Sequence, residues 1–304
     1  MLKVSIVTTC YNRAATVVES VRSVMRQSYD NLEHIVVDGA SKDGTVEAIK
    51  ACGSTRIARL VSEPDRGCYE ALNKGCRFAT GDVIGWLHSD DTFYDQHVIE
   101  DVVDVFERTG CDVVYGNGLF VSETNHAWVL RDWQSGKYSS YSMANGWLPL
   151  HTTVFVRREI FRRYGFYRED YVISADSEWL LRILYKTNLN VQYMNRYVVI
   201  MAYGGLSTSW SKTFLRWRED LGIYYQHDIS PRTALVKKVL SKVPQFLKAP
   251  FVKLPFTHLR HSFGQKKKAH APKEEVLDPE IQKMIMHDSN ATEFVPRQSQ
   301  HAEF

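Results

Sequence analysis

Two consecutive aspartates, Asp90 and Asp91, follow a short apolar run at residues 83–87. Such a run is typical of a buried strand, so both carboxylates are expected where the strand leaves a sheet. Adjacent carboxylates repel each other unless a cation or strong hydrogen-bond donors neutralise them. Oxygen ligands of this kind suit Mg²⁺ or Mn²⁺ together with a substrate phosphate. The pair therefore predicts a metal site; the alternative is a solvated loop that caps a helix beginning near Asp95.

The elements that must position this pair alternate between β-rich and helical patterns. Strands are expected at residues 4–9, 32–38, 57–62, 83–87 and 111–115, and helices at 14–26, 45–51, 68–79 and 95–108. This alternation predicts an α/β fold, with a mostly parallel sheet and helices on both faces. Ligands of such sheets bind beyond the carboxyl ends of the strands. The polar tails of the first four strands should therefore converge on one cleft.

The second half of the chain departs from this alternation. A hairpin is expected at residues 119–131, a strand at 152–156, and helices at 158–164 and 176–186. From about Phe214 the α/β pattern fades into a basic, proline-interrupted stretch and then a polar tail, which we expect to be disordered. We predict a catalytic-type α/β domain at residues 1–215, a basic extension at 216–273 and the tail at 274–304.

Composition places the chain among globular proteins. Of its 304 residues, 44% are hydrophobic, enough for a sizeable core. No run of 18 apolar residues and no secretory leader is apparent, which predicts a cytoplasmic location. The five cysteines lack C-x-x-C spacing and are expected to be reduced core residues. The net charge of +3 hides a division, because residues 229–273 hold eleven Lys or Arg and no acid.

The strand tails could bind a nucleotide. Thr9 and Tyr11 offer a hydroxyl and an aromatic face to a planar base, and Asp38 could accept from a base N–H. Asp43 is expected in a turn and helix start instead. Neither a Rossmann glycine motif nor a P-loop follows the first strand, so a metal would have to do more of the work on the phosphates.

Five motifs, in order and spacing, resemble the family 2 glycosyltransferases of GT-A fold. They lie at residues 4–13, 37–45, 62–67, 71–75 and 87–91, and the likeness extends over about residues 1–210. The chain is most similar to bacterial enzymes that assemble O-antigen, colanic acid and other exopolysaccharides. The resemblance implies Mn²⁺ or Mg²⁺ as cofactor and a nucleotide-diphosphate sugar as donor.

Site roles follow residue by residue from this resemblance. Donor-nucleotide contacts are implied for Thr9, Tyr11, Asp38, Asp65, Lys74 and Asp90, and metal binding for Asp91 and Asp90. The family often has a further Asp where this chain has His88, so which of the two remaining carboxylates binds the metal directly stays open. Asn73 and Lys74 are expected on a helix that faces the diphosphate. The alternative for Lys74 is an ordinary exposed helix lysine.

The resemblance also implies a general base in the second half. Asp176 matches the central Asp of the family's acidic motif, and Glu178 holds a second acidic position on the acceptor side; Ala175 stands where many members have another acid. The alternative for Asp176 is a helix cap. His151 resembles a histidine that lines the acceptor side, and is as compatible with a core position.

The basic stretch has an amphipathic pattern. Apolar residues at 235, 236, 239, 240 and 243 fall on one helical face, with lysines elsewhere. This predicts an interfacial anchor for an anionic membrane surface. A helix packed on the catalytic body is the alternative, and the acidic remainder of the chain disfavours a nucleic-acid partner.

Together these features predict an inverting, metal-dependent glycosyltransferase. Its acceptor would be a growing glycan, expected on a polyprenyl diphosphate at the inner face of the cell membrane, in cell-surface polysaccharide biosynthesis. The alternatives are a soluble or protein acceptor, or a non-catalytic nucleotide-sugar-binding partner of another transferase.

Overall fold

The computed structural model describes residues 1–122, 128–203, 213–252 and 254. Residues 1–264 form one compact unit, and residues 265–304, a second unit, lie outside the described part. Among the described residues, no helix is both long and apolar enough to cross a membrane. The predicted polar tail and much of the basic stretch also fall outside the description.

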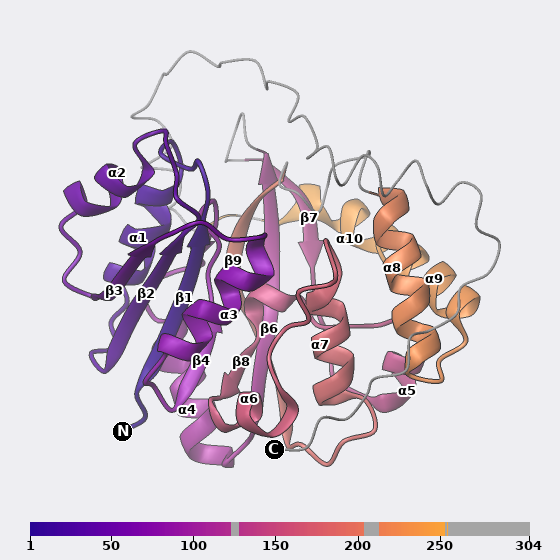
Figure 1. The fold of residues 1–304 in the computed structure, drawn as a ribbon. Helices are drawn as coiled ribbons and strands as arrows, with labels where there is room; N and C mark the ends of the chain where they lie inside the picture. The colour runs from indigo at the N-terminus through magenta and orange to yellow at the C-terminus, as the bar shows by residue number, and fades with distance from the viewer. Residues whose placement is uncertain (123–127, 204–212, 253, 255–304) are drawn as a thin grey trace, which may run out of the picture. The chain divides into compact units, whose positions relative to one another are not determined.

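The elements appear in the predicted order through the first half of the chain (Figure 1). The strands are β1 Val4–Cys10, β2 Leu32–Asp38, β3 Ile57–Ser62, β4 Val83–Trp86, β5 Thr92–Phe93, β6 Val113–Ser122, β7 Val129–Trp133, β8 Phe155–Arg157 and β9 Val191–Tyr203. The helices are α1 Val17–Met25, α2 Thr45–Ala51, α3 Cys68–Phe78, α4 Val98–Thr109, α5 Ser140–Ala144, α6 Glu159–Tyr164, α7 Ala175–Leu184, α8 Thr213–Gln226, α9 Pro231–Leu240 and α10 Val243–Lys248.

The sheet is parallel where the alternation is regular and mixed beyond it. Strands β3, β2, β1 and β4 are parallel neighbours, and β6 and β9 form a second parallel pair. Strand β8 lies between β4 and β6 and is antiparallel to both. The mostly parallel α/β fold is therefore confirmed, but the sheet is not parallel throughout. The short β8 belongs to the second half of the chain, beyond the regular alternation of strands and helices.

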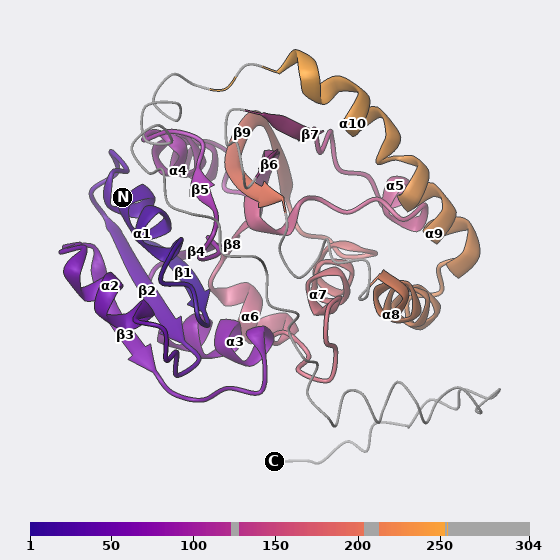
Figure 2. The same ribbon diagram turned by 90° about the horizontal axis from the view of Figure 1, so that it is seen from above.

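Helices cover both faces of the sheet, as predicted. Figure 2 shows α3 and α6 on one side of the strands and α1 and α4 on the other. Alternation along β1 explains this arrangement, because Val7 belongs to the core under α3 and α7, whereas Val4 and Ile6 belong to the core under α4. The carboxyl ends of β1, β2 and β4 are held rigidly at one edge as a result.

Two elements of the second half differ from the predicted pattern. Residues 151–153 form a 3₁₀ turn and the strand starts at Phe155, so the predicted strand at 152–156 was placed too early. The Thr153 hydroxyl donates to the Leu150 carbonyl oxygen at 2.7 Å, a local bond that competes with a strand ladder. The long strand β9 was not predicted. The expected hairpin is β6–β7, whose turn residues lie outside the description.

Helices α8, α9 and α10 form a row from α7 to β7 (Figure 2). Ala234 of α9 is fully buried, and its carbonyl oxygen would lie 2.2 Å from a Cβ built on Gly146, so only glycine allows this approach. The outward side of α9 and α10 leaves several apolar side chains exposed: Val236, Val239, Leu240, Val243, Phe246 and Leu247. The buried side of α9 thus fits the alternative of a helix packed on the catalytic body, whereas attachment to a membrane stays a prediction. The predicted boundary at residue 215 falls inside α8.

Candidate active site

A small cradle forms where β1 and β2 end. A Cβ built on Gly39 would lie 2.6 Å from the Asp65 Oδ2 and 3.3 Å from the Tyr11 Cδ2, so the two side chains flank the bare backbone of Gly39. Tyr11 is 61% exposed and presents its ring to solvent, whereas Thr9 is buried. Burial raises the pKa of Asp65, which accepts from the Gly67 amide at 3.0 Å. The structure therefore brings together Tyr11, Asp38 and Asp65.

Asp38 is buried but fully provided with donors. Its Oδ2 accepts from the Ser41 amide at 2.9 Å and from the Ser62 hydroxyl at 2.7 Å, and its Oδ1 accepts from the Ser41 hydroxyl. These bonds fix the orientation of the Asp38 carboxyl. The sequence singled out Asp38 as a candidate site residue. Its partner Ser62 of β3 was part of a motif but received no role of its own.

The two tails are also tied to each other. The Asn12 amide donates to the Ser41 hydroxyl at 2.7 Å, and the Lys42 amide donates to the Asn12 side-chain oxygen at 3.1 Å. Asn12 and Ala40 both have positive φ, at 51° and 60°. Backbone held in this sparsely populated region marks a conformation that the surrounding bonds impose. Asp43 lies in the turn that leads into α2 and accepts from the Thr45 amide at 3.1 Å, as predicted.

Lys74 and Asn73 are engaged with protein groups. The Lys74 ammonium lies 3.0 Å from Glu63 and 3.1 Å from Glu70, and donates to the Pro64 carbonyl oxygen at 3.1 Å. Asn73 is buried, and its amide bonds the Tyr167 backbone instead of facing a cleft. The Asn73 side chain thus points into the protein, and the expectation that helix α3 faces the diphosphate stays a prediction. A diphosphate contact by Lys74 stays a prediction.

The aspartate pair lies just past β4, but it is not the exposed pair that the sequence suggested. Asp91 is only 2% exposed, and its Oδ2 is buried without a hydrogen-bond partner. Burial, reinforced by repulsion from Asp90, raises the pKa of Asp91 well above its ordinary value. Asp90 is half-buried, and burial lowers the pKa of the neighbouring His88.

This arrangement fits a hard divalent cation. A buried carboxylate oxygen without a partner is rare and costly, and a cation beside it would remove that cost. Within the part of the chain that the structure describes, however, no three His, Cys, Asp or Glu side chains converge closely enough to hold a metal by themselves. The remaining ligands would have to come from a bound molecule.

Asp176 lies in the first turn of α7, and its carboxyl faces Tyr69 of α3. Its Oδ1 accepts from the Ser177 amide at 2.8 Å and lies 3.5 Å from the Tyr69 hydroxyl oxygen. Burial raises the pKa of Asp176, and attraction to Lys238 of α9 opposes this rise. The bond to Ser177 shows that Asp176 also contributes to capping, so the cap and a base are compatible roles. A raised pKa brings a carboxylate closer to the basicity that proton abstraction requires.

Glu178 is buried in an ion pair. The Arg182 guanidinium donates to both of its oxygens at 2.9 Å, and also to the Phe166 carbonyl oxygen at 2.8 Å. These contacts hold the loop before α7. A direct acceptor contact by Glu178 stays a prediction.

His151 is a buried histidine under the aspartate pair. Its Nε2 lies 2.7 Å from the Tyr167 hydroxyl oxygen, and its ring centroid lies 5.0 Å from that of Trp86 and 6.2 Å from that of His88. Burial lowers the pKa of His151 to about 3, so the ring is neutral. The structure thus realises the core position, and an acceptor contact by His151 stays a prediction.

Sequence reasoning missed the groups that hold Asp176 in place. Glu219 of α8 accepts from the amides of Val172, Ile173 and Ser174 at 2.8–3.0 Å, which fixes the segment that leads into α7. The Tyr69 hydroxyl donates to the Ile173 carbonyl oxygen at 2.5 Å. No sequence signal pointed to Glu219, because it lies more than 40 residues from Asp176 in a helix expected to be an appendage.

Comparison with known proteins decides the family. The family model for glycosyl transferase family 2 matches residues 5–169, more than half of the chain. The chain belongs to glycosyl transferase family 2. A PGL/p-HBAD biosynthesis glycosyltransferase of Mycobacterium bovis is 30% identical over 219 residues, covering 70% of this chain and 82% of that protein. A second relative, an uncharacterized glycosyltransferase of Mycobacterium tuberculosis, is 31% identical over 59% of this chain and 68% of its own length.

Solved structures show the same fold. The chain superimposes on S. aureus TarS in complex with UDP-GlcNAc with a TM-score of 0.58 and 14% identity, covering 82% of this chain and 72% of TarS. A mannosyltransferase from Pyrobaculum calidifontis, in complex with GDP-Man and Mn²⁺, gives a TM-score of 0.55 and 18% identity, covering 86% and 79%. The family 2 assignment is confirmed, and the closer likeness to O-antigen enzymes stays a prediction.

Proposed function

We propose that this family 2 glycosyltransferase transfers a sugar from a nucleotide-diphosphate donor with inversion, using Mn²⁺ or Mg²⁺. The observation that carries the proposal is the buried Asp91 Oδ2, which has no partner and lies beside Asp90 at the end of β4. Asp90 and Asp91 would hold the cation, with donor phosphates completing the ligands. The cation would supply neutralisation of the departing diphosphate. The Mn²⁺ complex of the mannosyltransferase from P. calidifontis supports this choice.

The donor nucleoside is proposed to lie on the cradle beside Gly39. The exposed Tyr11 ring offers a stacking face. Asp38, whose carboxylate is held by Ser41 and Ser62, is assigned to the nucleoside on the family resemblance. The Asp65 carboxyl lies against the backbone of Gly39. Thr9, Lys74 and Asp90 are assigned to the donor on the family resemblance alone.

Asp176 is proposed as the general base. It would accept the proton of the acceptor hydroxyl while that oxygen forms a bond to the anomeric carbon and the bond from this carbon to the diphosphate oxygen breaks. Burial favours this role, because it raises the pKa of Asp176 toward the basicity required. His151 and Glu178 would support the acceptor side through Tyr167 and Arg182.

The acceptor is proposed to be a growing, lipid-linked glycan of cell-surface polysaccharide biosynthesis. The exposed apolar side chains of α9 and α10, such as Leu247 at 69% exposure, support attachment of residues 216–273 to an anionic membrane from the cytoplasmic side. The related mycobacterial protein is named for PGL/p-HBAD biosynthesis. A soluble or protein acceptor, and a non-catalytic nucleotide-sugar-binding role, are the competing possibilities.

The test is a screen of UDP-, GDP- and dTDP-sugars by thermal shift, with Mn²⁺ or with EDTA, followed by donor hydrolysis. A donor that binds only the folded state raises apparent stability by RT ln(1 + [L]/Kd). We expect one nucleotide class to stabilise the protein with Mn²⁺ and to be hydrolysed slowly. Equal stabilisation and turnover in EDTA would refute the metal, and binding without turnover in the presence of acceptor extracts would favour the non-catalytic role.

A further inference from the structure

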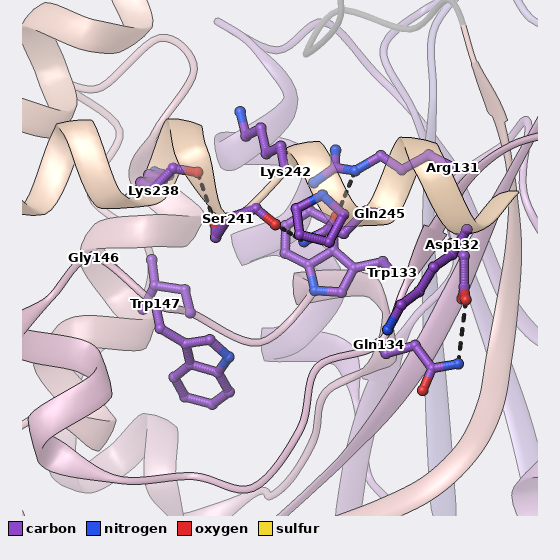
Figure 3. Close-up of a pocket in the computed structure, with 13 residues that line it drawn as sticks. Arg131, Asp132, Trp133, Gln134, Gly146, Trp147, Lys238, Ser241, Lys242 and Gln245 are labelled. Atoms are coloured by element: carbon purple, nitrogen blue, oxygen red, sulfur yellow. Dashed lines mark hydrogen bonds between the residues drawn. The ribbon is translucent and has the colours of Figure 1, made fainter.

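A basic pocket lies between β7, residues 146–148 and the α9–α10 segment (Figure 3). Its volume is about 220 Å³. Arg131, Trp133, Trp147, Lys238, Lys242 and Lys248 are among its lining residues. None of them was singled out for the donor site.

The charges in this pocket are only partly balanced. Lys238 is neutralised by the buried Asp220, at 2.8 and 2.9 Å. The lining Asp132 accepts from the Tyr197 hydroxyl at 2.9 Å. Among the described residues, no acidic side chain forms an ion pair with Arg131 or Lys242. Asp132 and Asp220 offset two of the four lining cations, so an excess of positive charge remains.

Arg131 is held in place but incompletely bonded. It is 7% exposed, and its guanidinium lies over Trp133 and Phe120, at 4.2 and 5.0 Å from the ring centroids. Its Nε donates to the Gln245 side-chain oxygen at 2.7 Å, as Figure 3 shows, whereas its Nη2 is buried without a partner. Burial lowers the pKa of Arg131 to about 10.

Lys242 lies at the start of α10, the helix that also holds Gln245, and its ammonium is repelled by the charge of Arg131. Burial, followed by repulsion from Arg131, lowers the pKa of Lys242 to about 8. A buried Arg131 and a half-buried Lys242 that repel each other destabilise the folded chain, and a bound anion would relieve this repulsion.

We propose that this pocket binds a phosphate or diphosphate group of the acceptor. The inference rests on the proposed function and adds the acceptor's chemical class to it. A group with two or more negative charges matches the excess charge, and guanidinium and ammonium groups bind phosphate oxygens strongly. Lys238 lines the pocket and also attracts the carboxylate of Asp176, which links the pocket to the proposed base.

The same chemistry could come from a lipid diphosphate or from a soluble glycosyl phosphate. The outward apolar side chains of α9 and α10 flank the pocket, and Phe246 lies 5.6 Å from the Arg131 guanidinium. A prenyl chain leaving the pocket could cover these side chains. A lipid source would thus add apolar contacts to the ionic ones.

The test is isothermal titration of the full-length protein with inorganic pyrophosphate, in EDTA and without donor. We expect Lys242→Gln to weaken binding about tenfold or more, the loss of one charge-assisted contact. Lys248→Gln should also weaken binding. The control Arg232→Gln removes one charge from the exposed part of α9 outside the pocket and should stay within about twofold of wild type.

Equal binding by wild type and Lys242→Gln, equal losses in Lys242→Gln and Arg232→Gln, or no binding by wild type, would overturn the proposal. Thermal melts of each variant establish that it folds. Geranylgeranyl diphosphate replaces pyrophosphate in a second series: tighter binding identifies a lipid source, and equal binding a soluble phosphate. Because these titrations use neither donor nor metal, their result is independent of whether the donor-hydrolysis test succeeds.

Discussion

The ion pair between Lys238 of α9 and Asp220 of α8 joins the C-terminal helices to the candidate active site. The Lys238 ammonium lies 2.9 Å from Oδ1 and 2.8 Å from Oδ2 of Asp220, and the two side chains are 18% and 3% exposed. Burial disfavours the charged ammonium, but attraction to Asp220 outweighs it and raises the pKa of Lys238. The pair also acts on Asp176, since Lys238 lowers the pKa of that carboxyl and Asp220 raises it.

We predict that Lys238→Met destabilises the protein strongly, because it leaves the Asp220 carboxylate buried and unpaired. Removing one partner of a buried pair costs about 3–5 kcal/mol. At roughly 2–4 °C per kcal/mol, the melting temperature should fall by about 10 °C. The double variant Lys238→Met/Asp220→Leu should recover most of this loss, because no charge remains unpaired. Urea unfolding of Lys238→Met, of Asp220→Leu and of the double variant measures the coupling free energy between Lys238 and Asp220.

Lys238→Met and Asp220→Asn should shift the pH dependence of transfer in opposite directions. A base must be deprotonated, so the rate falls as the pH drops through the pKa of Asp176. Losing Lys238 removes attraction and moves this acidic limb to higher pH, whereas Asp220→Asn removes repulsion and moves it to lower pH. The assay is kcat against pH on variants that remain folded. An acidic limb that is unmoved in both variants, or a Lys238→Met variant as stable as wild type, would refute the reasoning.

Three further outcomes are expected. Asp176→Asn should retain donor binding but lose transfer by about 10²–10⁴-fold, as measured by titration and turnover; a parallel loss of affinity would make the residue structural. Asp91→Asn should abolish Mn²⁺-dependent transfer without loss of stability. The pKa of Asp91 is higher in the folded protein than in the unfolded chain, where it is about 4. The free energy of unfolding of the wild type should therefore fall as the pH rises between these two pKa values, and this fall should be smaller in Asp91→Asn. Leu240→Ser/Leu247→Ser should reduce flotation with phosphatidylglycerol vesicles, with the residual binding sensitive to salt; unchanged flotation would place the membrane contact elsewhere. These two exposed residues are better targets than truncation after Tyr225, which would also remove Lys238 and the packed side of α9.

The regular first half was open to prediction because its information is local. Apolar runs ending in polar turns located β1 to β4, and parallel strands necessarily bring their tails to one edge. That geometry sufficed to group Tyr11, Asp38 and Asp65. The same local pattern gave no account of β8 or β9. The antiparallel β8 and the 13-residue β9, which lies between β6 and β5, depend on partners far away in sequence.

By itself, the sequence determined the order of the elements in the first half, the aspartate pair after β4 and the acidic motif at the start of α7. Only the tertiary structure decided that Asp91 is buried with an unpaired oxygen, that Asn73 faces inward, and that Arg131 and Lys242 share a pocket. The reason is that burial and electrostatic coupling depend on which distant surfaces meet. A pattern of residue types fixes the period of a helix or strand, but the environment of each side chain is set by the elements that pack over it.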